Sequence, residues 1–194
     1  VMEGKAVLFK KFAGVDVFDI EIEERDPHKL VESIKSLEPT FGAINLEDIK
    51  APECFIVESE LRKQMKIPVF HDDQHGTAIV AAAAVYNGLR VVEKSIKDIK
   101  VVGSGSGAAS IACLDLLVSM GLPREQVTLV DRSGVIYKGR EQGMNPWKES
   151  YARETDDRTL ADAIAGADLF MGLSGPGVLT QDMVKTMGPK PLIL

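Results

Sequence analysis

The stretch Val101-Val102-Gly103-Ser104-Gly105-Ser106-Gly107-Ala108-Ala109-Ser110 decides the fold, because it joins an apolar strand to a helix through a run of glycines. Counted from Gly105 it reads G-x-G-x-x-S, with a small residue in the place of the third glycine. A tight turn at Gly105 and the lack of a side chain at Gly107 let the backbone approach a pyrophosphate at the start of the helix. The stretch therefore predicts a dinucleotide-binding loop, with Gly105, Ser106, Gly107, Ala108 and Ala109 in contact with the cofactor.

The next apolar run, VTLVD, ends on Asp131, at about the distance where a ribose-binding carboxylate is expected. A carboxylate at this position favours the free 2′-hydroxyl of NAD, whereas a neighbouring arginine accepts the 2′-phosphate of NADP. Because Arg132 follows directly, Asp131 favours NAD and Arg132 favours NADP. We expect NADP, with NAD left open. A glycine turn that binds nothing is the alternative, and the strand and helix on its two sides argue against it.

Around this loop, apolar runs of strand length alternate with helical stretches. We expect strands at 15–22, 41–46, 67–70, 99–103, 127–131, 168–174 and 191–194. We expect helices at 27–37, 54–65, 77–92, 107–120, 157–167 and 179–188, and a loop-rich excursion at 132–156. Such alternation predicts the α/β class with a parallel sheet that has helices on both faces.

This pattern predicts two domains. Residues 73–194 are expected to form a Rossmann-like, doubly wound parallel sheet that binds the nucleotide. Residues 1–72 are expected to form part of a smaller α/β domain, to which the resemblance described below assigns the substrate and the metal. The boundary is placed near 71–77, because the sequence that follows is sufficient for a nucleotide-binding unit.

Composition excludes several classes of protein. The chain of 194 residues is 45% hydrophobic and 27% charged, as expected of a globular protein. Its net charge of −6 argues against a nucleic-acid partner, and no apolar run approaches the length of a membrane helix. The two cysteines, Cys54 and Cys113, lie far apart in apolar segments, which indicates reduced thiols in a cytoplasmic protein.

Two acidic doublets, Glu47-Asp48 and Asp72-Asp73, each follow an expected strand directly. Open α/β sheets bind ligands at the carboxyl ends of their strands. Carboxylates that converge there repel one another unless a cation lies among them, and hard oxygen ligands suit Mg²⁺ or Mn²⁺. Solvated loop residues are the alternative reading of the doublets.

Lys5 and two histidines need context before a role can be assigned. A lysine serves as a base only where burial and a nearby cation favour its neutral form, and an exposed lysine is otherwise the simpler reading of Lys5. His71 and His75 flank the second doublet without a cysteine or a helical zinc motif nearby. We expect them to orient neighbouring groups or to cap the following helix.

Seven motifs occur in a fixed order: GKAVLFKKFAGVDVFDIEI, LEDI, IPVFHDDQHGTAIV, GSGSGAASIAC, DRSGVIYKGR, GMNPWK and SGPGVLT. With these motifs in this order, the chain closely resembles the bacterial malic enzymes over essentially its whole length. HDDQHGTA with LED upstream is the specific part. The resemblance implies that Lys5 is the catalytic lysine, with Asp72 as its partner, and that Glu47, Asp48 and Asp73 bind the metal. It also implies cofactor contacts at Thr77, at the glycine loop and at Ser174, in the loop Ser174–Gly177 near the nicotinamide.

The resemblance implies oxidative decarboxylation of (S)-malate to pyruvate and carbon dioxide, with NAD(P) as the hydride acceptor and Mg²⁺ or Mn²⁺ as the metal. Malate and pyruvate are then the small-molecule partners, and a homodimer or higher homo-oligomer is expected. The family's tyrosine acid, substrate arginine and A-N-P asparagine find no position in this sequence. We expect a piece of a longer protein, because the chain lacks an initiator segment and stops in an apolar run at 191–194.

Three other readings stay open from the sequence. One is another two-domain dehydrogenase, of the amino-acid or tetrahydrofolate type, which would have no reason to carry acidic doublets at two strand ends. A second is a non-catalytic nucleotide-binding module, against which Lys5 and the doublets speak. A third is a longer fusion with an acyltransferase-like domain after the last residue.

Overall fold

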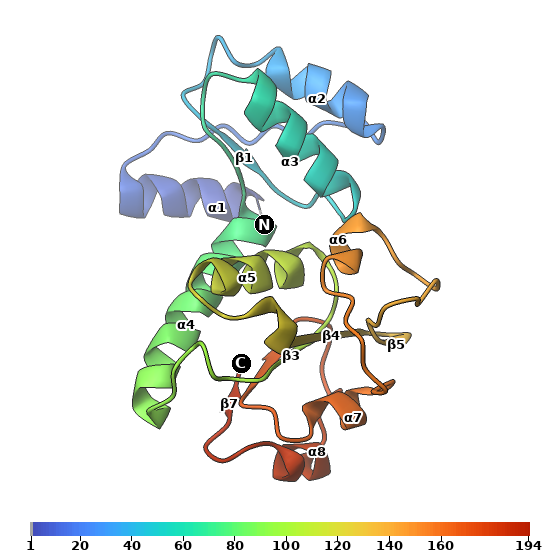
Figure 1. The fold of residues 1–194 in the computed structure, drawn as a ribbon. Helices are drawn as coiled ribbons and strands as arrows, with labels where there is room; N and C mark the ends of the chain where they lie inside the picture. Colours follow the sequence, from blue (N-terminus) through green and yellow to red (C-terminus); the bar gives the residue numbers. More distant parts are fainter. Residues whose placement is uncertain (1) are drawn as a thin grey trace. The chain divides into compact units, whose positions relative to one another are not determined.

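The computed structural model describes residues 2–194, which form two compact units. One unit ends at His71 and the other runs Asp72–Leu194. Figure 1 labels most of the helices and strands of both. None of the helices among the described residues is long and apolar enough to span a membrane.

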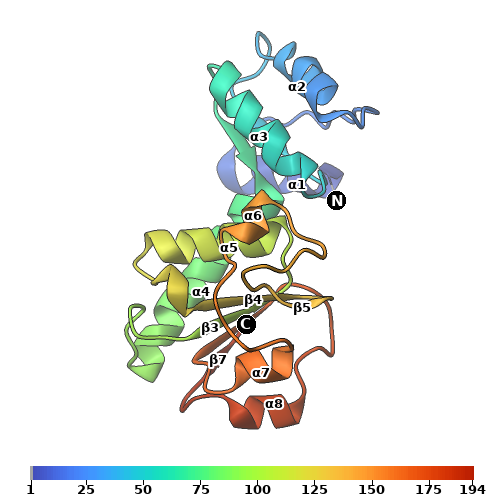
Figure 2. The same ribbon diagram turned by 45° about the vertical axis from the view of Figure 1, so that its right-hand side comes forward.

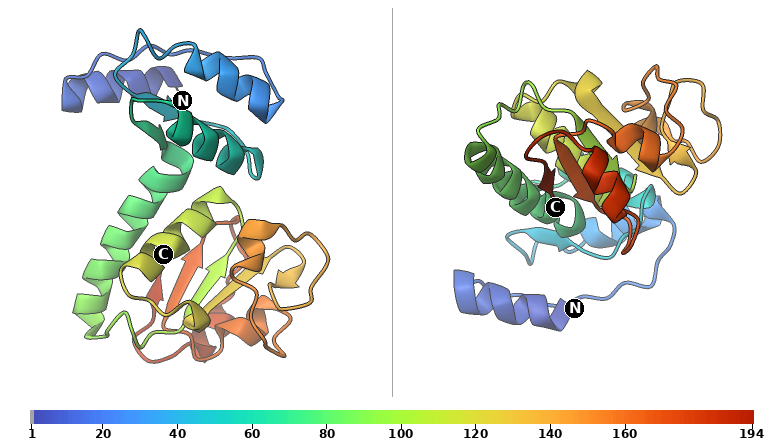
Figure 3. Two further views of the ribbon diagram at one scale, coloured as in Figure 1. Left: turned by 45° about the horizontal axis from the view of Figure 1, so that its top comes forward. Right: turned by 90° about the horizontal axis from the view of Figure 1, so that it is seen from below.

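The second unit is built on a five-stranded sheet in the order β5-β4-β3-β6-β7. All neighbouring strands run parallel except β4 and β5, which are antiparallel. The left view of Figure 3 shows the strands side by side. Their bounds are β3 Val101–Ser104, β4 Val127–Asp131, β5 Gly134–Val135, β6 Leu169–Gly172 and β7 Leu192–Ile193.

Helices cover both faces of this sheet. Figure 2 shows α4 and α5 on one face and α7 and α8 on the other. The helical segments are η2 Asp72–Gly76, α4 Thr77–Val92, α5 Ala108–Ser119, η3 Arg124–Gln126, α6 Pro146–Glu149, α7 Leu160–Ile164 and α8 Gln181–Thr186. A parallel-dominated sheet between two helical layers confirms the predicted Rossmann-like, doubly wound α/β fold.

The core of this unit comes from strands that are apolar along their length. The four residues of β3 are all buried, and so are the first four of β4. Buried residues pack between the sheet and the α7–α8 layer, and they are Val102, Val130, Val135, Ala163, Ile164, Ala167, Phe170 and Met187. Strands buried on both faces need this continuous apolar pattern, which is why the sequence located them correctly.

The first unit is smaller. Its parallel strands β1 (Ile44–Leu46) and β2 (Val69–His71) pair in the register Ile44↔Val69 and Leu46↔His71. Its helical segments are α1 Met2–Leu8, η1 Phe9–Ala13, α2 Pro27–Lys35 and α3 Glu53–Gln64. The predicted start of α2 is confirmed, since the Asp26 carboxylate accepts from the backbone N–H of His28 and of Lys29. The buried cluster of this unit is Val31, Ile34, Leu46, Val57, Leu61, Met65 and Val69.

The predicted strand at 15–22 is wrong. The structure has irregular, extended chain there, and the apolar run at 6–9 lies in α1 and η1. Large side chains of the segment remain exposed, and they are Val7, Leu8, Phe9, Phe12, Val15, Val17, Phe18, Ile20 and Ile22. Alternation of apolar and acidic residues indicates that a segment can form a strand, but a strand also needs a hydrogen-bonding neighbour. Among residues 2–194 this segment pairs with no strand.

The excursion at 132–156 is more ordered than expected. It contains β5, which pairs with the end of β4 through Asp131↔Gly134, and the short helix α6. Asn145 caps α6 by accepting from the backbone N–H of Lys148, and Pro146 occupies the first helical position. The excursion therefore folds back to the carboxyl end of β4.

Candidate functional site

The glycine loop has the geometry that a dinucleotide requires. Gly105 has a φ of 110°, and its N–H donates to the carbonyl oxygen of Val130 at 2.8 Å. A Cβ at Gly105 would lie 2.6 Å from the carbonyl oxygen of Leu173, so another residue would have to displace backbone. A Cβ at Gly107 would meet nothing within 4 Å, and no side chain caps α5. The open space at Gly107 and the uncapped amides of Ala108 and Ala109 fit a bound pyrophosphate.

This loop lies at the point where the strand order reverses. From β3 the chain continues through α5 to β4 on one side, whereas β6 joins β3 on the other side. Ligands of open α/β sheets bind in the crevice outside the strands at such a point. Two more predicted cofactor residues are found here: Ser106 Oγ donates to Asp131 Oδ2 at 3.2 Å, and Ser174 follows β6. Thr77 begins α4, which packs against α5.

Asp131 does not present a free carboxylate. Its Oδ1 accepts from Arg140 Nη2 at 2.7 Å, and its Oδ2 accepts from Lys148 Nζ at 2.9 Å. The backbone N–H of Ser133 also donates to Oδ1 at 2.9 Å. Burial works to raise the pKa of Asp131, but the hydrogen bonds from Lys148 and Arg140 outweigh it and hold the pKa below its ordinary value. Asp131 is thus an ionised group that is already paired with two cations.

Arg140 and Lys148 were missed by the sequence reasoning. The Arg140 side chain is only 4% exposed, and its guanidinium also donates to the carbonyl oxygens of Gly134, Val135 and Gln142. Lys148 Nζ also donates to the carbonyl oxygen of Gly143 at 2.7 Å. The motifs DRSGVIYKGR and GMNPWK contain both residues, but only folding of the excursion brings them to Asp131.

Around the end of β4, cations therefore outnumber carboxylates. Arg132 is exposed directly after Asp131, while Arg140 and Lys148 occupy the two oxygens of that carboxylate. The paired Asp131 leaves an excess of positive charge at the position where the adenosine ribose of a dinucleotide is expected. Such an excess suits an additional phosphate group.

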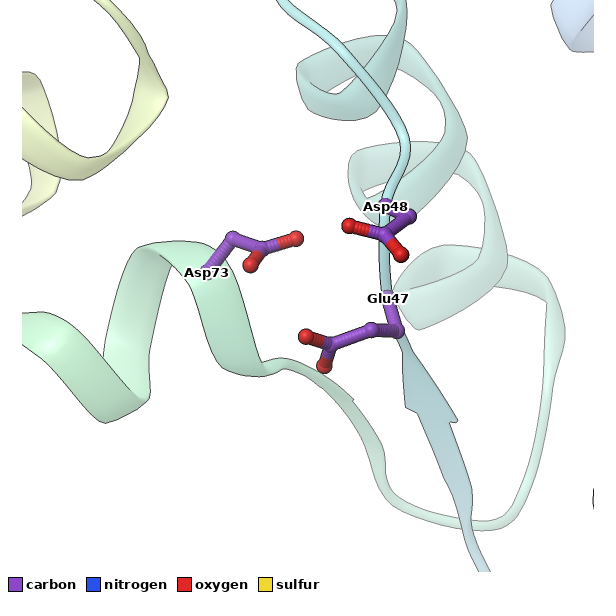
Figure 4. A group of neighbouring side chains, drawn as sticks. All are labelled: Glu47, Asp48 and Asp73. Atoms are coloured by element: carbon purple, nitrogen blue, oxygen red, sulfur yellow. The ribbon is translucent and has the colours of Figure 1, made fainter. Parts of the chain in front are cut away.

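The acidic doublets follow the two paired strands of the first unit. Because Leu46 pairs with His71 in parallel register, the residues after β1 and after β2 leave the sheet at the same edge. One carboxylate oxygen from each of Glu47, Asp48 and Asp73 lies within 4.8 Å of the others. Figure 4 shows the three carboxylates turned toward a common space. The structure thus brings together the three residues that the sequence suggested as metal ligands.

Two local features support this group. Asp48 has a φ of 56°, a left-handed conformation that aspartate tolerates better than most residues and that often marks a functional turn. Lys5, on α1, donates from Nζ to Glu47 Oε2, and the Glu47 side chain is nearly buried. The lysine thereby offsets part of the negative charge of the group.

Asp72, His71 and His75, which the sequence analysis also considered, are next to Asp73 or within two residues of it in the sequence. Asp72 starts η2, and its carboxylate lies against Gly76, so that a Cβ at Gly76 would overlap it. His71 is fully buried, with neither ring nitrogen hydrogen-bonded, and His75 lies in η2. In the part of the chain that the structure describes, the group suited to a metal contains carboxylates and no histidine. Three carboxylates form a hard donor set that fits Mg²⁺ or Mn²⁺, which leave positions for water and substrate.

Residues 74–194 match the family described as "Malic enzyme, NAD binding domain". The chain belongs to the malic enzyme family. It is 63% identical to an NADP-dependent malic enzyme of Haemophilus influenzae, over the whole of this chain and 26% of that protein. It is 61% identical to an NAD-dependent malic enzyme of Rhizobium meliloti, over the whole of this chain and 25% of that protein. The chain therefore spans about a quarter of the length of these two curated relatives.

A solved structure gives the same result. The crystal structure of an NAD-dependent malic enzyme from Thermotoga maritima superposes with a TM-score of 0.93 at 42% sequence identity. The match covers 99% of this chain and 52% of that chain. Because the fold matches over nearly the full chain and the sequence over the whole of it, the resemblance seen in the sequence is confirmed at the level of the family.

Proposed function

We propose that the protein oxidises and decarboxylates (S)-malate to pyruvate and carbon dioxide, with NAD(P) as hydride acceptor and Mg²⁺ or Mn²⁺ as the metal. The observation that carries this proposal is the convergence of Glu47, Asp48 and Asp73 in a chain that also holds a dinucleotide loop. A dehydrogenase that only moves a hydride needs no such group. Decarboxylation of a β-keto acid is favoured by such a group, because the cation it would hold stabilises the negative charge that develops on the keto oxygen.

The residues have distinct roles in this proposal. A cation held here would supply stabilisation of developing negative charge, and a bound nicotinamide would supply the hydride acceptor. Glu47, Asp48 and Asp73 hold and orient the cation. Lys5 donates to Glu47 in the structure. With Glu47 on the cation and the ammonium proton released, the neutral Lys5 amine would accept the hydroxyl proton of malate. Asp72 assists that proton transfer.

The cofactor is proposed to be NADP rather than NAD. A free carboxylate would bind both ribose hydroxyls of NAD, but both oxygens of Asp131 accept from cations. Arg132 and Lys148 can instead bind a 2′-phosphate, and Asp131 holds Lys148 in place for that contact. Gly105 to Ala109 take the pyrophosphate, and Ser174 lies on the nicotinamide side. Thr77 is a further proposed contact of the cofactor.

The proposal is tested by calorimetric titration of Mn²⁺ and of NADPH into the wild-type protein and Asp73→Ala. Loss of one charged ligand should abolish or strongly weaken Mn²⁺ binding and leave NADPH binding intact. Asp182→Ala is the matched control, since Asp182 is an exposed carboxylate that pairs only with Lys185 nearby. Equal Mn²⁺ affinity in wild type and Asp73→Ala would show that the acidic doublets are ordinary loop residues. It would contradict the proposed metal-assisted reaction.

The other dehydrogenase classes and a non-catalytic module are not favoured by membership in the malic enzyme family. Malate-dependent reduction of NADP that stops on chelation of the metal and returns with Mn²⁺ separates the proposed enzyme from both. A metal-independent turnover would restore the first alternative, and nucleotide binding without turnover would restore the second.

We also propose a cytoplasmic homodimer or higher homo-oligomer in which residues 1–72 belong to the catalytic, metal-binding domain and residues 73–194 to the nucleotide domain. Cys54 and Cys113 are free and buried, and burial raises the pKa of each thiol to about 11, which suits a reducing compartment. Sedimentation of the purified protein tests the oligomeric state.

A further inference from the structure

A pair of serine hydroxyls lies at the point where the strand order reverses. Ser104 is the last residue of β3 and is 5% exposed, and its Oγ lies 3.0 Å from Oγ of Ser174. Ser174 is exposed and follows β6, the parallel neighbour of β3. The backbone N–H of Leu173 also donates to the carbonyl oxygen of Ser104 at 2.8 Å. Two independent contacts therefore tie the end of β3 to the start of the Ser174 loop.

Burial determines which of the two serine hydroxyls donates the hydrogen bond. A buried hydroxyl is costly unless its hydrogen finds an acceptor. Within residues 2–194, Oγ of Ser174 is the hydrogen-bond partner of the Ser104 hydroxyl. Ser104 therefore donates, and Ser174 accepts. The hydrogen of Ser174 is then turned away from Ser104, toward the exposed side of the loop.

The exposed side is where the second half of a dinucleotide would lie. Asp131 and its cations, at the end of β4, mark the adenosine half, and Gly107 at the start of α5 marks the pyrophosphate. Strand β6 lies on the other side of β3. A donor that follows β6 thus faces the nicotinamide half, whose ribose and carboxamide offer oxygen acceptors.

We propose that Ser104 is a positioning residue for the nicotinamide half of the cofactor: its buried hydroxyl donates to Ser174, so that Ser174 donates to an oxygen of the nicotinamide riboside. This inference rests on the proposed function, because it assumes a nicotinamide dinucleotide as the ligand. Gly105 contributes to the same arrangement, since any Cβ there would push the backbone of Leu173 and Ser174 away.

Binding of two ligands separates this role from a structural one. NADPH contains both halves of the dinucleotide, whereas adenosine 2′,5′-bisphosphate lacks the pyrophosphate and the nicotinamide riboside. Fluorescence titration of NADPH and calorimetric titration of adenosine 2′,5′-bisphosphate are performed on the whole protein. The variants are Ser104→Ala, Ser174→Ala and the double variant. Ser119→Ala is the control, because that hydroxyl bonds only to the carbonyl oxygen of Leu116 in its own helix.

Each single variant should weaken NADPH binding by about 5-fold, the usual effect of one neutral hydrogen bond. The double variant should be no weaker than Ser174→Ala alone, because Ser104 acts through Ser174. Affinity for adenosine 2′,5′-bisphosphate should not change, and Ser119→Ala should behave as wild type.

Four results overturn the inference. Unchanged NADPH affinity in Ser104→Ala, or additive losses in the double variant, would show that Ser104 does not act through Ser174. Equal weakening of both ligands would show a general distortion of the sheet. If the wild-type protein bound no NADPH, the proposed function would fail and the inference with it, whereas wild-type binding with an unaffected Ser104→Ala removes the inference alone.

Discussion

In the second unit, β3 and most of β4 are buried within a five-stranded sheet that has helices on both faces. In the described part of the first unit, two short strands form a sheet of their own, and a segment between Val7 and Ile22 exposes large apolar side chains. The two candidate sites therefore have different structural requirements. A nucleotide loop depends on one βαβ unit that is contiguous in sequence, whereas the acidic group depends on pairing of strands whose residues are far apart.

The largest expected effect concerns the first unit. Lys5→Ala should lower kcat for malate oxidation by on the order of 10²–10⁴, the usual share of general acid–base catalysis. NADPH affinity should remain unchanged. Lys10→Ala is the matched control, because Lys10 lies in the same helical region in an exposed ion pair with Asp16. Steady-state kinetics measure this change. A near-normal kcat in Lys5→Ala would show that Lys5 is an ordinary surface lysine with no part in proton transfer.

Removal of a core side chain should affect the second unit strongly. Leu129 is fully buried in β4, so Leu129→Ala should reduce the free energy of unfolding by about 2–5 kcal/mol. Urea denaturation followed by circular dichroism measures this loss. A change below about 0.5 kcal/mol would mean that the β3–β4 layer is less tightly packed than its burial indicates.

Cofactor preference should change through the end of β4. Lys148→Ala and Arg132→Ala should each raise KM for NADP roughly 10-fold or more, as a charged hydrogen bond contributes about 1.5–3 kcal/mol. Lys148→Ala also frees one oxygen of Asp131 for a ribose hydroxyl, so KM for NAD should not rise. Arg124→Ala is the control, because Arg124 lies before the opposite end of β4 in an exposed ion pair with Asp115. Parallel increases for NAD and NADP would exclude both residues from 2′-phosphate recognition.

The smallest effect is expected in the exposed segment of the first unit. Phe12 is 77% exposed, so Phe12→Ser should change the free energy of unfolding by no more than about 0.5 kcal/mol. Denaturation of the whole protein measures this value. A loss comparable with that of Leu129→Ala would show that the segment is covered in the assembled protein.

Much of the fold could be predicted where local signals agreed. The helix α4 and strand β4 were predicted with their observed bounds, and the helix expected at 27–37 was predicted with the observed start of α2. The strand at 15–22 was wrong because alternation reports only what a segment can form. The ordered part of the excursion at 132–156 was not predicted, because β5 and α6 are too short for a periodic pattern to reveal.

By itself the sequence determined the family and the βαβ unit. It also predicted which acidic, lysine and glycine residues belong to the candidate sites, because these residues lie in contiguous motifs. Only the tertiary structure decided that Asp131 is paired with Arg140 and Lys148, and that Ser104 bonds to Ser174. These partners are separated by loops or by whole strands and helices. Hydrogen bonds between such residues depend on how the chain returns to the sheet, which no local pattern specifies.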